Sequence, residues 1–396
     1  MLNMPAIFRV VMLSVLTHTA FKGSKVLMSL SALELGANEF FVGVLFSTYA
    51  LFPLLLSVYA GKISDRIGFR KPMLFGAVGL LAGLSLPFLV HRLEVLYISA
   101  ALIGFCYIFY TVSIQHLIGA MAEGMDRTRN YSWFSLGVGI TALLGPTAAG
   151  VLIDAVGHRS TFGLLGVLPV VPVLLLAFYP GWLPATAQHQ HGAADKSNHR
   201  FADLLRDRPL RRALIVAGII ETGLELYNLL LPIYGHRIGL SATEIGLILG
   251  AFGLALLLVR ALMPHLVKRS SEERVLAASL MLATLVCLVF PFVKGFVTLL
   301  LISFVMGIGL GCGSPLSMML AYNRAPAGRS GEAMGLRQMA NKGTEILVPF
   351  VFGSLSTAFG MVPVFWLDAV LLAIAGWLMR RDAVQRAGTV VPGKEN

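Results

Sequence analysis

The sequence predicts an all-α membrane protein with twelve transmembrane helices in two pseudo-symmetric six-helix bundles. Apolar runs of about 20 residues, the length at which a helix crosses a bilayer, recur along the whole chain. Hydrophobic residues make up 57% of the 396 positions and charged residues only 13%, whereas soluble proteins are about one-quarter charged. The two halves of the sequence also match each other in one register, which indicates an internal repeat.

The predicted crossings are separated by short connections and by one long polar stretch. Residues 1–182 are expected to form an N-terminal bundle and residues 211–380 a C-terminal bundle, joined by a cytoplasmic linker at 183–210. Residues 381–396 are expected to form a cytoplasmic tail. The expected crossings are 6–33, 39–60, 72–90, 95–119, 131–153, 160–182, 211–235, 242–264, 273–293, 296–323, 331–357 and 361–380.

Positive charge alternates between the connections. Lys and Arg gather in the even-numbered connections and the tail, whereas the odd-numbered connections contain only Arg92, Arg159, Arg237 and Lys294. Cytoplasmic loops of membrane proteins carry an excess of Lys and Arg, so the even-numbered connections and both termini are predicted to be cytoplasmic. We therefore expect a multi-pass protein of the cell inner (cytoplasmic) membrane. This arrangement accounts for the net charge of +11 without nucleic-acid binding.

A shift of 203 positions aligns the two halves without gaps. The matched pairs include Gly36 with Gly239, Gly43 with Gly246, Gly104 with Gly307, Pro146 with Pro349 and Gly150 with Gly353. Chance matches between glycines are common, but a shared Pro-x-x-x-Gly inside matched crossings is much rarer. Transporters built from repeats place the substrate site between the halves, near the middle of the membrane.

A basic stretch between the second and third crossings is the most informative motif, with Asp65 as the one acidic residue among its cations. A short hairpin is predicted over its residues, which are Gly61, Asp65, Arg66, Gly68, Arg70 and Lys71. This stretch resembles the loop between helices two and three of the major facilitator superfamily, with Phe69 at a commonly basic position. The resemblance covers essentially the whole chain. It implies a latch in which Asp65 meets the start of helix eleven, near residues 330–332, in the outward-facing state.

The fifth crossing carries a second motif. Its residues are Gly139, Gly145, Pro146 and Gly150, with Gly137 before them. Proline bends a membrane helix, and small residues allow close helix packing. The pattern resembles the family's antiporter motif and favours efflux. Ala100 stands near the position where the family's drug–proton exchangers often have an Arg, so the resemblance does not extend to that route of proton coupling.

Charged residues inside the predicted crossings are costly in a bilayer and mark candidate sites for substrate or protons. Two sets, each on one helical face, are related by the 203-residue shift: His18, Lys22 and Lys25, and Glu221, Glu225 and Asn228. We expect these stripes to face each other across a central cavity; static pairs within one half are the alternative. Asn341 and Glu345 are further candidates, whereas Arg337 is expected to snorkel to the cytoplasmic surface.

These features predict a secondary active transporter that moves a small organic molecule by alternating access. Proton-coupled efflux (antiport) is expected, and a proton-coupled uptake symporter is the alternative. A membrane-embedded receptor or enzyme is a distant alternative, because the sequence has no nucleophile constellation or sensory domain. The three cysteines lie singly, so no metal or cofactor is expected. The expected partners are the small-molecule substrate, protons and the lipid bilayer, and a monomer is expected.

Overall fold

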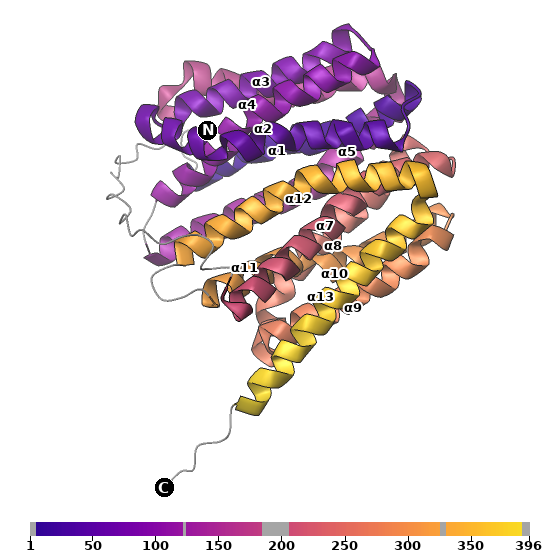
Figure 1. Ribbon diagram of the computed structural model, residues 1–396. Helices are drawn as coiled ribbons and strands as arrows, with labels where there is room; N and C mark the ends of the chain where they lie inside the picture. Colours follow the sequence, from indigo (N-terminus) through magenta and orange to yellow (C-terminus); the bar gives the residue numbers. More distant parts are fainter. Residues whose placement is uncertain (1–4, 122–123, 184–205, 325–329, 390–396) are drawn as a thin grey trace.

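The computed structural model describes residues 5–121, 124–183, 206–324 and 330–389 (Figure 1). Within these ranges the chain is helical and contains no strand, in agreement with the predicted all-α class. The helices are α1 (Ala6–Glu34), α2 (Glu39–Ile67), α3 (Arg70–Leu89), α4 (Leu93–Ala120), α5 (Gly124–Phe178), α7 (Arg208–Arg237), α8 (Ala242–Arg269), α9 (Glu272–Val289), α10 (Phe296–Gly311), α11 (Gly313–Asn323), α12 (Ser330–Phe359) and α13 (Met361–Thr389). Short 3-10 turns at Pro180–Trp182 and Phe290–Phe292 follow α5 and α9.

In the part of the chain that the structure describes, ten helical segments are long and apolar enough to cross a membrane. One of them, Trp133–Phe178, has 46 residues and is bent at Gly157, where φ is +81°. The helix α12 is not among the ten, because Arg337, Lys342 and Glu345 interrupt its apolar character. Length and composition alone therefore give fewer crossings than the twelve predicted.

Matching turns connect matching helices in the two halves. The glycines with positive φ that stand 203 positions apart are Gly36 with Gly239 and Gly157 with Gly360. A polar side chain also caps α2 and α8 in the same way, because Asn38 and Ser241 each accept a hydrogen bond from the backbone N–H three residues later, at 3.1 and 3.2 Å. The repeat thus recurs in the local geometry of these turns.

The basic stretch at 61–71 is mostly helix, so the prediction of a hairpin was wrong. The last turns of α2 continue through Ile67, and only Gly68 and Phe69 separate α2 from α3. The positive φ of Gly68, +79°, allows the sharp turn. Nothing in this stretch stops the helix earlier, since the glycine at its start is a single tolerated residue.

Two more boundaries differ from the prediction. The helix α13 continues to Thr389, so the expected tail from 381 is helical over most of its length. The linker predicted at 183–210 falls mainly on residues 184–205, which lie outside the described residues, and α7 begins at Arg208. The remaining predicted crossings agree with observed helices to within a few residues.

Helices from the first half pack mainly on one another, with α1 against α5 and α3 against α4, and those of the second half do likewise. Contacts between the halves run mainly through α2 with α12 and α5 with α8. We call the end with the α2–α3 and α8–α9 turns the basic end, after the exposed Arg66, Lys71, Lys268 and Arg269. The opposite end, toward the right in Figure 1, holds the α1–α2 and α12–α13 turns and is called the far end.

Candidate functional site

Two helix pairs meet closely near the far end, α2 with α12 and α5 with α8. A methyl group on Gly43 of α2 would collide with the carbonyl oxygen of Pro349 on α12. One on Gly246 of α8 would lie 2.6 Å from the carbonyl oxygen of Pro146 on α5. The 203-residue shift relates these contacts, so the repeat builds the same backbone contact twice. Small residues permit such an approach, and the two halves meet here through their backbones.

Hydrogen bonds to helix starts accompany both contacts. The Asp154 carboxylate accepts bonds from the N–H groups of Ala242 (3.2 Å) and Thr243 (2.7 Å), which begin α8. At the related position, the Thr357 hydroxyl oxygen accepts a bond from the Phe40 N–H at 3.0 Å, at the start of α2. Helix starts have unpaired N–H groups and attract negative charge. Sequence reasoning missed both residues, although the repeat register aligns them.

A cavity of about 770 Å³ lies between the halves. On α2 its lining falls within residues 49–57, on the basic-end side of Gly43. On α12 its lining falls within residues 337–345, on the basic-end side of Pro349. The cavity therefore extends from the middle of the molecule toward the basic end, while the backbone contacts close the far end.

Some of the predicted site residues line this cavity and others do not. Those that line it are Lys25, Glu221, Glu225, Asn341 and Glu345, and those that do not are His18, Lys22 and Asn228. The Lys25 Nζ atom on α1 lies 3.6 Å from a carboxylate oxygen of Glu225 on α7. A cation of the first half thus pairs with a carboxylate of the second, in the arrangement that the matched stripes predicted. Their part in transport stays a prediction.

The predicted residues that do not line the cavity make local contacts. His18 is buried, with Nδ1 3.0 Å from the Ser14 carbonyl oxygen. The Cβ of Lys22 occupies the space beside Gly145, where α1 meets α5. The Asn228 side chain donates a hydrogen bond to a carbonyl of its own helix at 2.8 Å. The first half therefore presents Lys25, rather than its whole stripe, to the cavity.

Polar side chains of α7 and α12 form the second-half wall of the cavity. The Asn341 side-chain amide donates to a Glu221 carboxylate oxygen at 3.4 Å, and Lys342 pairs with Glu345 on the same helix. Each of these charges has a partner inside the protein. Among the described residues, no group of three His, Cys, Asp or Glu side chains is placed to hold a metal ion.

Arg337 lines the same wall but does not snorkel to the surface, so that prediction was wrong. Only 5% of the residue is exposed. Its Nη2 donates to the Ser314 carbonyl oxygen at 3.1 Å and lies 3.3 Å from the Ser317 hydroxyl. These acceptors on α11 replace the water that a snorkelling guanidinium would reach.

Three aromatic residues of the first-half wall form a cluster that sequence reasoning missed. The Phe21 ring stacks on Tyr107, with centroids 4.3 Å apart, and meets Tyr49 edge-on at 5.8 Å. The Lys25 Nζ atom lies 5.9 Å from the Phe21 centroid and 5.6 Å from that of Phe46. The aromatic faces stabilise this cation in addition to its carboxylate partner. The rings come from α1, α2 and α4, so no single stretch of sequence reveals them.

The basic stretch lies outside the cavity. The Arg70 guanidinium donates to the carbonyl oxygens of Leu176 (2.6 Å) and Ala177 (2.9 Å) near the end of α5, while Arg66 and Lys71 are exposed. Gly61 is buried beside α4. The Asp65 side chain lies outside the described residues, so the latch stays a prediction.

The helix-five motif is a packing surface. Gly145 lies against Gly23 of α1, and Gly139 lies beside Leu257 of α8. Pro146 and Gly150 form the contact with α8 described above. The motif thus brings α5 close to helices of both halves.

The sequence model of the Major Facilitator Superfamily matches residues 10–341 and 213–395 of this chain. The chain belongs to this superfamily. Its curated relatives include "Quinolone resistance protein NorA" of Staphylococcus aureus (strain MSSA476), 23% identical over 348 residues, or 86% of this chain and 87% of that protein. They also include "Multidrug resistance protein 2" of Bacillus subtilis (strain 168), 22% identical over 267 residues, or 66% of each chain.

Solved structures of superfamily-like transporters share the fold. The peptide transporter POT in complex with sulfate superposes with a TM-score of 0.79 at 15% identity, covering 98% of this chain and 96% of that one. The nucleoside transporter NupG superposes with a TM-score of 0.75 at 14% identity, covering 96% and 99%. The family and these relatives are transporters, so this membrane protein moves a small molecule and is not an enzyme.

Proposed function

We propose that this protein exports a small organic molecule across the inner membrane in exchange for protons. The chain crosses the membrane twelve times, as one six-helix bundle within residues 1–182 and another within 211–380, joined by the linker at 183–210. Counting the two parts of α5 on either side of Gly157 as separate crossings, and adding the polar α12, supports this number.

The observation that carries the proposal is the cavity between the halves, closed at the far end and extended toward the basic end. Under the positive-inside rule the basic end is cytoplasmic, and so are both termini. The structure then corresponds to an inward-open state. Rocking the halves would part the backbone contacts at the far end and bring the basic ends together, with Asp65 meeting the start of α12.

Charge competition in the cavity supplies the coupling. Lys25 and Glu225 join the halves in the inward-open state, and Glu221 and Glu345 lie on the same wall. A proton on Glu225 removes the charge that holds Lys25, and a substrate with a charged group competes for the same atoms. Binding of a proton or of substrate can therefore shift the equilibrium between the inward-open and outward-open states, because each ligand interacts differently with the two states.

Two observations support export: the relatives named for drug resistance, and the resemblance of the helix-five motif to an antiporter motif. Proton-coupled uptake is the second candidate, because the fold also superposes on a peptide transporter and a nucleoside transporter. A substrate screen in proteoliposomes, with and without an imposed pH gradient, distinguishes the two. Export requires that an inward proton gradient drive substrate out; substrate accumulation with the protons supports uptake, and indifference to the gradient removes proton coupling.

The coupling role of Glu225 is tested by Glu225→Gln. We expect transport driven by the pH gradient to fall at least about tenfold, while substrate exchange without a gradient is retained, because the amide cannot take up a proton. Glu94→Gln, at an exposed position in the first turn of α4, is the matched control and should change neither activity. Undiminished gradient-driven transport by Glu225→Gln would contradict the coupling scheme.

A further inference from the structure

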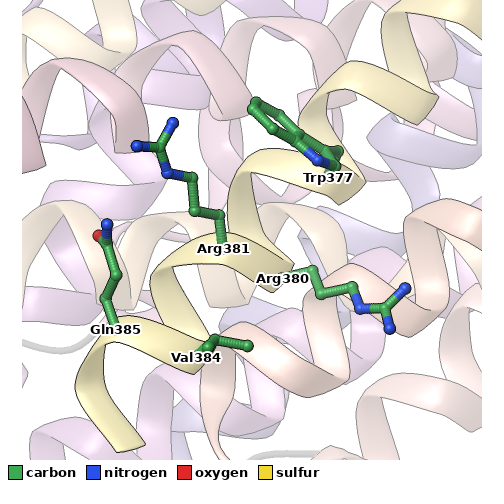
Figure 2. Close-up of a pocket in the computed structure, with 5 residues that line it drawn as sticks. All are labelled: Trp377, Arg380, Arg381, Val384 and Gln385. Carbon is green, nitrogen blue, oxygen red and sulfur yellow. The ribbon is translucent and has the colours of Figure 1, made fainter. Parts of the chain in front are cut away.

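The last turns of α13 carry a small surface pocket at the basic end, away from the central cavity. It has a volume of about 300 Å³ and is lined by Trp377, Arg380, Arg381, Val384 and Gln385 (Figure 2). Their spacing along α13 puts them on one side of the helix. Trp377 is 55% exposed and Val384 is 67% exposed. This side combines cations with large apolar groups.

The two guanidinium groups on this side have no carboxylate partner among the described residues. The Arg381 guanidinium lies 5.7 Å from the centroid of the Trp377 ring, which fixes it over an apolar surface. The neighbouring Asp382 points the other way: its two oxygens lie 2.8 Å from Arg212 and 2.8 Å from Arg324. On the inward side of the helix the charge of Asp382 is thus paired with two arginines, whereas the two arginines on the outward side have no carboxylate partner among the described residues.

The position along α13 sets the depth of these charges in the membrane. Exposed apolar side chains continue from the pocket along the same helix, at Trp366, Val370 and Ile374. From Met361, at the start of the helix, to Arg380 the rise is about 28 Å at 1.5 Å per residue, close to the thickness of the hydrocarbon core. The arginines therefore emerge at the level of lipid headgroups, with Trp377 just inside, where tryptophans gather in membrane proteins.

We propose that this pocket binds an anionic phospholipid: the guanidinium groups of Arg380 and Arg381, which point apart in Figure 2, turn toward its phosphate, and an acyl chain lies along Trp377 and Ile374. Guanidinium groups match phosphate oxygens in charge and in the geometry of their hydrogen-bond donors. The apolar residues below the arginines distinguish a lipid from a soluble phosphate, which would gain nothing from them. The site depends on membrane insertion with the basic end at a headgroup layer, and not on the direction or coupling of transport.

The test is native mass spectrometry of the full-length protein released from detergent with phosphatidylglycerol or with zwitterionic phosphatidylethanolamine. The wild type should bind phosphatidylglycerol preferentially, and Arg380→Gln combined with Arg381→Gln should weaken that binding about thirty-fold, since each cation near a headgroup contributes separately. Lys268→Gln combined with Arg269→Gln, an exposed pair at the same end, is the matched control and should bind as the wild type does. The thermal unfolding midpoint shows that each variant is folded.

Three outcomes would overturn the site. The first is equal retention of phosphatidylglycerol by the wild type and the α13 variant, and the second is equal affinity for the two lipids. The third is displacement of the lipid by inorganic phosphate at the same concentration, which would reassign the pocket to a soluble anion. None of these readouts measures transport, so the lipid site and the proposed export can fail independently.

Discussion

At the basic end, Arg9 of the first half reaches the 3-10 turn that follows α5, and its repeat counterpart Arg212 of the second half reaches α13. Arg9 donates to the Gly181 carbonyl oxygen at 3.2 Å, whereas Arg212 donates to the Asp382 carboxylate at 2.8 Å. Arg70 likewise reaches carbonyls near the end of α5, and the residue 203 positions later is an acid, Glu273. The repeat thus keeps polar residues at these matched positions, but their partners and the chemistry of their contacts differ between the halves.

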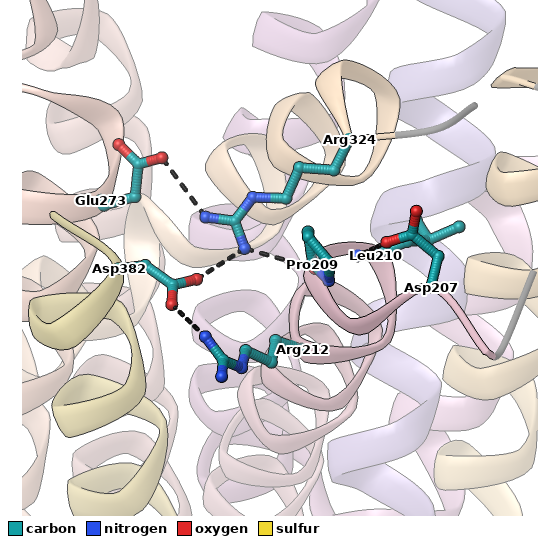
Figure 3. Close-up of polar contacts among 7 residues, drawn as sticks. All are labelled: Asp207, Pro209, Leu210, Arg212, Glu273, Arg324 and Asp382. Atoms are coloured by element: carbon teal, nitrogen blue, oxygen red, sulfur yellow. Dashed lines mark hydrogen bonds and ion pairs between the residues drawn. The ribbon is translucent and has the colours of Figure 1, made fainter. Parts of the chain in front are cut away.

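In the second half these changes produce a buried network of ions. The Arg324 guanidinium lies 2.8 Å from Asp382 and 3.3 Å from Glu273, and Asp382 also holds Arg212 (Figure 3). The side chains of Arg324 and Glu273 are 5% and 2% exposed. Neutral carbonyls at a helix end can exchange partners with water, but a buried ion left unpaired is costly. Breaking the contacts at this end should therefore cost more free energy in the second half than in the first.

At the far end the difference is reversed. There the first half supplies the carboxylate, Asp154, to the start of α8, and the second half supplies a neutral hydroxyl, Thr357, to the start of α2. The two contacts that close the far end therefore have the same backbone geometry and unequal electrostatics. The repeat thus sets the backbone geometry of these contacts, and the side chains particular to each half set their charge.

The largest expected effect is on the buried ion network. Asp382→Asn leaves Arg212 without its charged partner and Arg324 with Glu273 alone, so we expect a loss of about 3–5 kcal/mol in the free energy of unfolding. The matched change Arg9→Gln removes one hydrogen bond to a carbonyl and should cost about 1 kcal/mol. Denaturant unfolding in detergent, followed by tryptophan fluorescence, measures both. Equal losses would show that the ion network of the second half contributes no more to stability than the hydrogen bond of Arg9 in the first half.

The next effect concerns closure of the far end. Gly43→Val and Gly246→Val each put a side chain into a backbone contact, and overpacking of about 1–3 kcal/mol should lower the ratio of closed to open far ends by a factor of about 5 to 150. Spin-label distances across the far end measure that ratio. Gly218→Val is the control, because its Cβ would meet nothing within 4 Å. If only one of the two substitutions opens the far end, the two contacts do not contribute equally to closure.

The smallest effect concerns the charge at the start of α8. Asp154→Asn removes the charge and keeps one of the two acceptor oxygens, so the closed population should fall about two- to fivefold. Thr357→Ser keeps the hydroxyl and should leave that population unchanged. The same distance measurement distinguishes them, and an equal shift in both variants would show that charge is not the source of the difference.

Sequence reasoning predicted the features that a single helix or the repeat encodes. The 203-residue shift aligns the two charged stripes, so one of their cations was predicted to pair with a carboxylate across the halves, and the structure shows that pair to be Lys25 with Glu225. His18 and Lys22 share the stripe of Lys25, but α1 also packs against α5 and α4, which takes these two side chains out of the cavity. One periodicity cannot show which of several neighbours a helix face meets.

Features that depend on several helices could not be predicted. The aromatic wall combines Phe21, Tyr49 and Tyr107 from three helices, and Arg337 stays inside because α11 offers Ser314 and Ser317 as acceptors. The helical extent of the basic stretch was missed because its charges suggested a loop. An α-helix at a membrane surface tolerates charges, since its backbone groups are already paired.

The glycine contacts between α2 and α12 and between α5 and α8 also bear on speed. Interlocked side chains must change rotamer before two helices separate, and each change adds to the barrier. Gly43 and Gly246 have no side chains to interlock, so the helices can separate and meet again there without rotamer changes at these positions. The far end can thus be closely packed when it is closed and still open with a low barrier from side-chain rearrangement.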